Sequence, residues 1–214
     1  AIVCNECSWV GTDARMNDEE MARYYNDYRG QEYNDLRIKY DPRYREIAEH
    51  FETQAEVDRR LVGLNYILEQ SVELESIKTL LDFGGNDGKF IPKFEHHVDK
   101  YVYDISSKPV EPGVKKLDLN SNMIFDFVMC CHVVEHESDP DRVIEQVLKF
   151  GDNETLFYFE VPNYDCPSVP GGVFHEHLSI FNPKSISTFL LRHRLMIVDS
   201  VKYSDYIEIG RAHV

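Results

Sequence analysis

One stretch decides the fold: Leu80-Leu81-Asp82-Phe83-Gly84-Gly85-Asn86-Asp87-Gly88-Lys89-Phe90. Residues 79–83 form a short apolar run that predicts a buried strand. The glycines that follow predict a tight turn that lets the backbone approach a ligand, because glycine has no Cβ. Residues 89–91 predict the start of a helix. A strand, a glycine-rich loop and a helix are the parts of a nucleotide pocket, although a plain turn gives the same pattern.

A second strand, residues 100–104, ends at Asp104, about twenty residues beyond the glycine loop. A carboxylate there can accept hydrogen bonds from both ribose hydroxyls. The spacing resembles the first motif of class I S-adenosylmethionine-dependent methyltransferases, with Asn86 where that family usually has a glycine. The G-x-G-x-x-G spacing of dinucleotide-binding enzymes is absent. The resemblance implies S-adenosylmethionine as cofactor, bound by Asp82, Gly84, Gly85, Asn86, Gly88 and Asp104.

Composition narrows the class of partner. The chain has 214 residues and a formal net charge of −15, and Lys and Arg do not cluster. Nucleic acid is therefore disfavoured, and we expect a small-molecule substrate. No apolar run approaches the roughly 20 residues that span a bilayer, and no signal peptide is evident, so we predict no membrane partner and a cytoplasmic location. The five cysteines do not resemble a disulfide framework.

The two ends of the chain look different from the middle. Cys4 and Cys7 form a Cys-x-x-Cys pair that reads as half of a zinc ribbon. Tetrahedral zinc needs four ligands, so a bound ion requires a second pair upstream, and two incidental cysteines are the alternative. Residues 208–214 resemble a translated sequencing adapter. We therefore divide the chain into a zinc-ribbon-like remnant (1–15), a helical, tyrosine-rich cap (16–75), the cofactor-binding domain (76–207) and a non-native tail (208–214).

The predicted cap is polar and rich in tyrosine up to Tyr40, and we place it over the pocket. From Pro42 apolar residues recur at helical steps and are expected in the core. They are Tyr44, Ile47, Phe51, Val57, Leu61, Leu64, Ile67 and Leu68. In the resembled methyltransferases such helices cover the cofactor, which implies that Tyr33 or Arg37 reaches it.

Three further strands are predicted at residues 114–117, 125–131 and 155–161. Asp118 and Leu119 match, by position, a pair that contacts adenine in the resembled family; an aspartate that caps a turn is the alternative. His132 follows the fourth strand and is placed at the cofactor rim, since ligands bind at the carboxyl ends of parallel strands. A zinc site formed by Cys130, Cys131, His132 and His136 is disfavoured, because adjacent strand residues such as Cys130 and Cys131 point to opposite faces of the sheet.

A long loop after residue 162 carries the candidate catalytic residues His175, Glu176 and His177. Loops of this length inside a compact domain are usually functional, and a carboxylate beside a histidine raises the proton affinity of the imidazole. A histidine bonded only to backbone is the alternative. A metal site at these residues would need further ligands.

Residues 175–181, followed by Asn182-Pro183-Lys184-Ser185 and a helix to Arg194, resemble the deoxysugar C-methyltransferases and related polysaccharide-tailoring methyltransferases. Those enzymes also carry an N-terminal zinc ribbon. The resemblance implies that Glu176 and His177 lie in the substrate site with the histidine as general base, and that the acceptor is a nucleotide-linked sugar or polysaccharide precursor. Phe174 stands where the family usually has an aromatic hydroxyl, which leaves the acceptor open.

The predicted fold is an α/β, Rossmann-like three-layer sandwich with a mostly parallel sheet. Its last, antiparallel strand should follow residues 198–203 and be cut short at about Tyr206. Two other functions remain. A nicotinamide-dependent sugar oxidoreductase would share the sheet and Asp104, but no Tyr-x-x-x-Lys pair follows the fourth strand. A non-catalytic cofactor-binding relative would not need His177.

Overall fold

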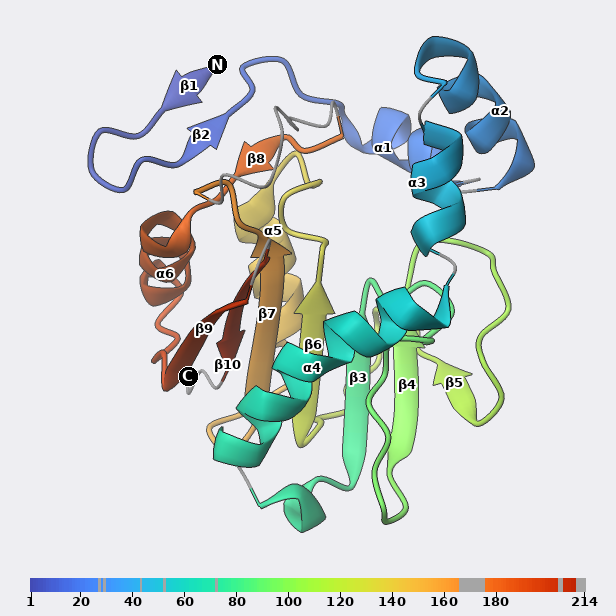
Figure 1. Cartoon of the computed structure of the whole chain (residues 1–214). Coiled ribbons are helices and arrows are strands. Elements are labelled where there is room, and N and C mark those ends of the chain that lie inside the picture. The colour runs from blue at the N-terminus through green and yellow to red at the C-terminus, as the bar shows by residue number, and fades with distance from the viewer. Residues whose placement is uncertain are drawn as a thin grey trace.

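A seven-stranded sheet forms the centre of the computed structural model (Figure 1). The structure describes residues 1–26, 28, 30–42, 44–51, 53–71, 73–165, 176–203 and 206–210. The strand order is β5-β4-β3-β6-β7-β10-β9. The five neighbouring strands β5, β4, β3, β6 and β7 are mutually parallel, and β10 is antiparallel to both of its neighbours, β7 and β9. The predicted Rossmann-like fold with a mostly parallel sheet is confirmed.

The strands of this sheet are β3 (Thr79–Phe83), β4 (Asp99–Tyr103), β5 (Val114–Lys116), β6 (Phe127–Cys131), β7 (Leu156–Pro162), β9 (Asp199–Tyr203) and β10 (Tyr206–Gly210). The helices are α1 (Asp18–Tyr25), α2 (Gln31–Tyr40), α3 (Tyr44–Phe51), α4 (Gln54–Ser71), the 3₁₀ turn η1 (Leu74–Ser76), α5 (Pro140–Leu148) and α6 (Pro183–Arg192). Among these described helices, none has the length and apolar character needed to cross a bilayer.

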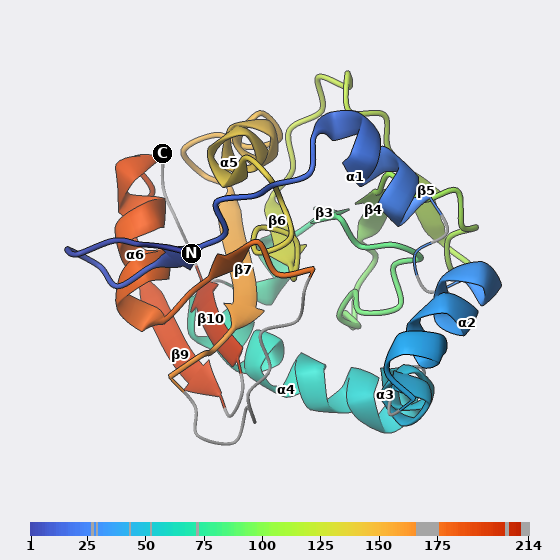
Figure 2. The same cartoon turned by 90° about the horizontal axis from the view of Figure 1, so that it is seen from above.

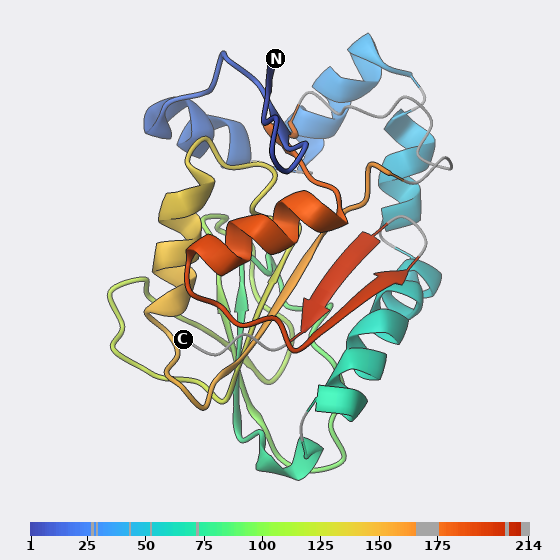
Figure 3. The same cartoon turned by 90° about the vertical axis from the view of Figure 1, so that its left-hand side faces the viewer.

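Two apolar layers cover the sheet, because side chains alternate between its faces. Phe127 and Met129 of β6 belong to the cluster that includes Leu64 and Ile67 of α4. The intervening Val128 belongs to the cluster with residues of α5 and α6. Figures 1 and 3 show α4 on one face and α5 and α6 on the other. Fully burying each such side chain contributes about 1.5–3 kcal/mol, so both layers stabilise the sheet.

The segment after β3 differs from the expectation. The predicted helix at residues 89–91 is absent, and the described residues 84–98 form turns, bends and irregular backbone instead. Gly88 N donates to Gly85 O (2.9 Å) and Ile91 N to Gly88 O (3.1 Å). Pro92 explains the difference, since a proline disfavours the helical conformation of the preceding residue and cannot donate a backbone hydrogen bond.

The C-terminal strand runs further than expected. β10 pairs with β7 over five residues, from Tyr206 opposite Pro162 to Gly210 opposite Tyr158. Residues 208–210, which we assigned to a non-native tail, are therefore part of the sheet, and the strand continues past Tyr206. Its backbone also pairs with β9, so β10 covers the edge of β7 and leaves β9 as the edge strand on this side of the sheet.

The N-terminal segment is joined to the loop that precedes α6. Strands β1 (Ile2–Val3), β2 (Val10–Gly11) and β8 (Ser179–Ile180) form a second, three-stranded sheet. Thr12 N also donates to Leu178 O (3.1 Å). Helices α1 to α3 lie on the side of the sheet where the parallel strands end, with α1 near β3 and β4 and with α2 and α3 further out, near the end of α4 (Figures 1 and 2). The N-terminal hairpin therefore fixes the backbone next to Glu176 and His177, beside the helices of the cap.

Candidate active site

A cavity of about 480 Å³ lies at the carboxyl ends of β3, β4 and β6. Its volume is typical of a site for a small molecule or cofactor. The predicted cofactor residues that line it are Asp82, Gly84, Gly85, Asn86, Asp104 and His132. The glycine loop and the ends of two further strands therefore converge on one pocket, covered by residues of α1 such as Met21 and Tyr25.

Asp104 holds the glycine loop in place. Its Oδ2 accepts a hydrogen bond from Asn86 N (2.8 Å), and its Oδ1 accepts one from Ser106 N (2.7 Å). A carboxylate has about four lone-pair sites, so Asp104 can still accept bonds from a ligand. Asn86 has φ of 54°. Asparagine is among the few non-glycine residues enriched in this left-handed region, which explains how it replaces the family's glycine.

The glycines before Asn86 are required by packing. A Cβ on Gly84 (φ +76°) would lie 2.3 Å from Val133 Cγ2, and a Cβ on Gly85 would lie 2.2 Å from the Asp82 carboxyl group. Burial raises the pKa of Asp82 to about 7, against the attraction of Arg60. Gly85 therefore lets the backbone pack directly against the buried Asp82 carboxyl group at the floor of the cavity.

Three predicted cofactor residues do not line the cavity. Asp118 Oδ1 accepts a hydrogen bond from Asn120 N (2.8 Å), which is the turn-capping role considered as the alternative. Leu119 packs against the core, and a Cβ on Gly88 would meet Val102 at 3.0 Å. Their contacts with a cofactor stay predictions. Ile105 lines the cavity in this region and was not identified from the sequence.

His132 sits in a buried network of opposite charges. Its Nε2 lies 2.6 Å from Glu160 Oε1, and its Nδ1 lies 3.2 Å from Glu135 Oε1. Arg60 Nε also donates to Glu160 Oε1 (3.2 Å), and the Tyr158 hydroxyl donates to Glu160 Oε2 (2.9 Å). The carboxylates of Glu160 and Glu135 thus contact the guanidinium of Arg60 and the imidazole of His132, two residues that line the pocket.

The network shifts the pKa values of its members. Burial by itself would raise the pKa of Glu160, but Arg60 and His132 outweigh it and lower that pKa to about 2. Burial likewise opposes ionisation of Glu135, yet its histidine neighbours lower its pKa to about 2. Burial and Arg60 disfavour the imidazolium of His132, but the two carboxylates raise its pKa. Sequence reasoning missed Arg60 and Glu160; the signal was a charged residue within the apolar strand 156–162.

Glu176 is 7% exposed and bound by the cap. Its Oε2 accepts hydrogen bonds from Arg37 Nη1 (2.9 Å) and from the Tyr24 hydroxyl (3.3 Å). Arg37 also stacks 4.6 Å from the centre of the Tyr44 ring. Arg37 and Tyr33, which we expected to reach the cofactor, are not among the residues that line the cavity. Arg37 instead links helix α2 of the cap to the loop of the candidate catalytic residues through its ion pair with Glu176.

His177 is buried beside a second histidine. Its Nδ1 contacts the Tyr164 hydroxyl, and its ring lies edge-on to His136 with 4.7 Å between centroids. Burial lowers the pKa of His177 to about 4. His136 lines the cavity, whereas His177 does not. His175 lies outside the described residues.

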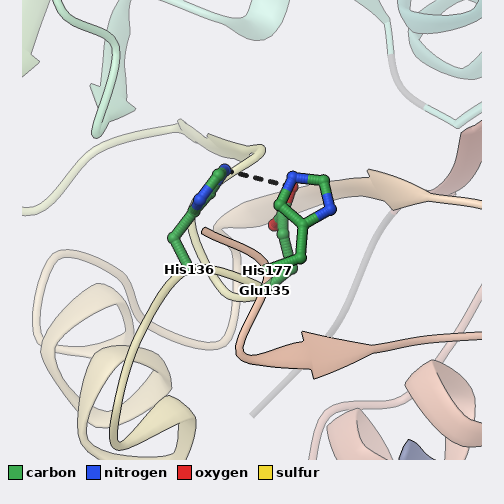
Figure 4. Close-up of side chains that lie close together, drawn as sticks. All are labelled: Glu135, His136 and His177. Carbon is green, nitrogen blue, oxygen red and sulfur yellow. Dashed lines mark ion pairs between the residues drawn. The ribbon is translucent and has the colours of Figure 1, made fainter. Parts of the chain in front are cut away.

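The side chains of Glu135, His136 and His177 come together next to the cavity, which His136 lines (Figure 4). One potential ligand atom from each lies within 4.8 Å of the others. The sequence analysis considered His136 only in a disfavoured zinc site with Cys130, Cys131 and His132. The meeting of Glu135, His136 and His177 is therefore a result of the fold.

Cys4 and Cys7 lie in the turn of the β1–β2 hairpin. Cys4 N donates to Trp9 O (2.8 Å) and Ser8 N to Cys4 O (2.9 Å). Hydrogen bonds from Cys7 and Glu6 lower the pKa of the Cys4 thiol. Within the part of the chain that the structure describes, the two cysteines belong to no group of three potential ligands. Zinc at this pair therefore stays a prediction.

Comparison with known proteins agrees with the fold and the pocket. Residues 49–196 match the family model described as a methyltransferase domain. A methyltransferase from Aquifex aeolicus, described as SAM-dependent, has a TM-score of 0.59 at 14% identity, covering 78% of this chain and 96% of that one. The magnesium protoporphyrin IX methyltransferase of Synechocystis, solved with S-adenosylhomocysteine (SAH), gives 0.56 at 15% identity, covering 92% and 100%. At these identities the likeness shows the fold.

Two curated relatives are uncharacterized proteins from two strains of Mycobacterium tuberculosis. Each is 27% identical over 108 residues, which are 50% of this chain. The match spans only about a third of those relatives, 36% of their length. Because the family model covers more than half of the chain, and the sheet order and pocket agree with it, the chain belongs to the methyltransferase-domain family, with the class I fold of S-adenosylmethionine-dependent methyltransferases.

Proposed function

We propose that the chain transfers a methyl group from S-adenosylmethionine to a small acceptor in the 480 Å³ cavity. The observation that carries this proposal is the contact of Asp104 with the backbone of Asn86 at the pocket floor. This contact holds the Asp104 carboxylate and the glycine loop next to each other, so both can contact one ligand. Binding of a nucleoside with free ribose hydroxyls requires such a pair. The structures solved with S-adenosylhomocysteine share this fold.

The acceptor in this proposal is a nucleotide-linked sugar or a polysaccharide precursor. Support comes from the resemblance of residues 175–185 to deoxysugar and polysaccharide-tailoring methyltransferases. The pocket wall also carries hydroxyl and cationic groups, from Tyr25, Tyr28 and Arg142, that suit a polar acceptor. A cytoplasmic location and a lack of nucleic-acid and membrane partners remain predictions from composition.

His177 is the proposed base that takes the acceptor's proton. Methyl transfer is a displacement in which positioning provides most of the acceleration and a base removes the proton. His177 is neutral at pH 7, because burial lowers its pKa to about 4. Contact with Tyr164 orients the ring, and the nearby Glu135 and Glu176 stabilise the imidazolium that forms. His136, in edge-on contact with His177, lines the cavity, so an acceptor in this proposal extends past His136 to bring its proton within reach of His177.

The test is a calorimetric titration of the folded chain with SAH and, separately, with NAD. Binding of SAH alone supports the proposal. Binding of NAD alone would replace it with the nicotinamide-dependent oxidoreductase, and binding of neither to a folded chain would contradict it.

The base assignment needs a second experiment. We expect His177→Ala to lower turnover with a sugar-nucleotide acceptor by about 10²- to 10⁴-fold while SAH affinity stays the same. The matched control is His97→Ala, a histidine with an 87% exposed side chain, which should change neither. Unaltered turnover in His177→Ala would remove His177 from the mechanism and favour a non-catalytic role for the loop.

A further inference from the structure

One buried carboxylate oxygen has a position that the contacts in the described part of the chain do not explain; it belongs to Glu135, the residue before His136, which lines the cavity. Glu135 is fully buried, and its Oε2 has no hydrogen-bond partner among the described residues. The other oxygen, Oε1, lies 3.2 Å from His132 Nδ1 and 3.7 Å from His136 Nε2. An ionised carboxylate oxygen that is buried without a partner costs several kcal/mol, so the free oxygen indicates a missing ligand.

The two neighbouring histidines offer nitrogen lone pairs at the same point. His136 Nδ1 donates to the backbone carbonyl of Glu176 (3.2 Å), which fixes the tautomer and leaves Nε2 as the acceptor. The Tyr164 hydroxyl contacts His177 Nδ1. In Figure 4 one ring nitrogen of His177 faces Glu135 and His136 while the other points away from them. Metal-bound histidines show this arrangement, in which the second nitrogen is held by a carbonyl or another polar group.

We propose that Glu135, His136 and His177 bind a divalent transition-metal ion of the zinc type. Two neutral imidazoles and one carboxylate are a known ligand set for such an ion. Tetrahedral bonds of about 2.0–2.2 Å separate ligand atoms by roughly 3.3–3.6 Å. His136 Nε2 lies 3.7 Å from Glu135 Oε1, so the carboxyl group that carries the unpartnered Oε2 lies at about ligand spacing from His136. All three ligand atoms already lie within 4.8 Å of one another.

The surroundings suit this ion. His132, on Glu135 Oε1, orients the carboxylate from behind. Three protein ligands leave a fourth position for water or a substrate oxygen, and His136 lines the cavity from which that oxygen would come.

This inference goes beyond the proposed function, because the three side chains meet whether or not the cavity binds S-adenosylmethionine. It has one consequence for the proposed base. Ion binding and proton uptake would use the same nitrogen of His177, so the metal-free chain is the form in which His177 acts as base. In the metal-loaded form the ion itself would hold and polarise an acceptor oxygen.

The experiment measures ion binding without cofactor or acceptor, so its outcome is independent of methyl transfer. Chelator-treated protein is titrated with Zn²⁺ by calorimetry and with Co²⁺ by visible absorption. Every sample carries Cys4→Ser and Cys7→Ser, because these thiols are a second potential site. We expect one ion per chain and a cobalt spectrum without thiolate charge-transfer bands.

Two ligand variants and one control decide the site. Glu135→Gln and His177→Ala should each weaken Zn²⁺ binding by at least about 10- to 100-fold, the loss known for even outer-shell partners. His97→Ala, outside the cluster, should bind as tightly as the parent. The proposal would be overturned if the parent protein bound no Zn²⁺, or if both ligand variants bound Zn²⁺ as tightly as the parent. Circular dichroism verifies folding, and if Glu135→Gln fails to fold, His177→Ala alone decides.

Discussion

Replacing Glu160 by glutamine tests whether the buried charge network stabilises the fold. Glu160 is 2% exposed and bonded to Arg60, His132 and Tyr158. Its pKa is lowered from 4.5 to about 2, and at about 1.36 kcal/mol per pKa unit this difference corresponds to roughly 3 kcal/mol at pH 7. Removing one partner of a buried ion pair typically costs 3–5 kcal/mol. We therefore expect Glu160→Gln to lose about 3 kcal/mol, or about 6–12 °C in Tm.

The assay is urea unfolding followed by circular dichroism, from pH 7 to pH 3. Because the pKa of Glu160 is lower in the folded state, its contribution is complete above pH 4.5 and is lost as the pH falls toward 2. The difference between wild type and variant should shrink over that range. Asp99→Asn is the control, since it breaks an exposed pair with Lys115 and should cost less than about 1 kcal/mol. A loss below about 1 kcal/mol for Glu160→Gln, or a difference independent of pH, would refute the reasoning.

Three further predictions concern the pocket floor. Asp104→Ala should weaken SAH binding by about 1.5–3 kcal/mol, the scale of hydrogen bonds to a charged group; unchanged affinity by calorimetry would exclude Asp104 from the ribose site. In thermal unfolding, Gly84→Ala should destabilise the protein more than Gly113→Ala does. Both glycines have a positive φ, which costs an alanine about 1–2 kcal/mol. At Gly84 the added Cβ would also lie 2.3 Å from Val133 Cγ2, whereas at Gly113 it would meet no atom of the described residues within 4 Å. Burial raises the folded-state pKa of Asp82 from 3.8 to about 7, so the wild type loses stability as rising pH favours ionisation of this buried group. The unfolding free energy of Asp82→Asn relative to wild type should therefore increase from about pH 5 to about pH 8, and a pH-independent difference would contradict this.

The sheet could be predicted because its strands carry strong local signals. β3 (Thr79–Phe83) was located to the residue, and β6 and β7 within one or two residues, since apolar runs bounded by polar residues admit few alternatives. The absent helix at residues 89–91 shows the limit of this reasoning. A glycine-rich loop favours a helix after it in this fold class, but Pro92, two residues beyond Phe90, decides the local backbone.

The floor and the wall of the site differ in how far sequence reveals them. Asp82, Asn86 and Asp104 are each fixed by a strand end, so topology alone brings them to one cavity. The wall depends on contacts between distant segments, such as Arg37 with Glu176 and Arg60 with Glu160. No spacing rule connects such pairs. The same holds for Glu135, His136 and His177, which meet only because the β8 segment returns to the end of β6: Ser179 N donates to Glu135 O (3.0 Å). The backbone bond that closes the second sheet onto this segment is therefore also what assembles the candidate metal site.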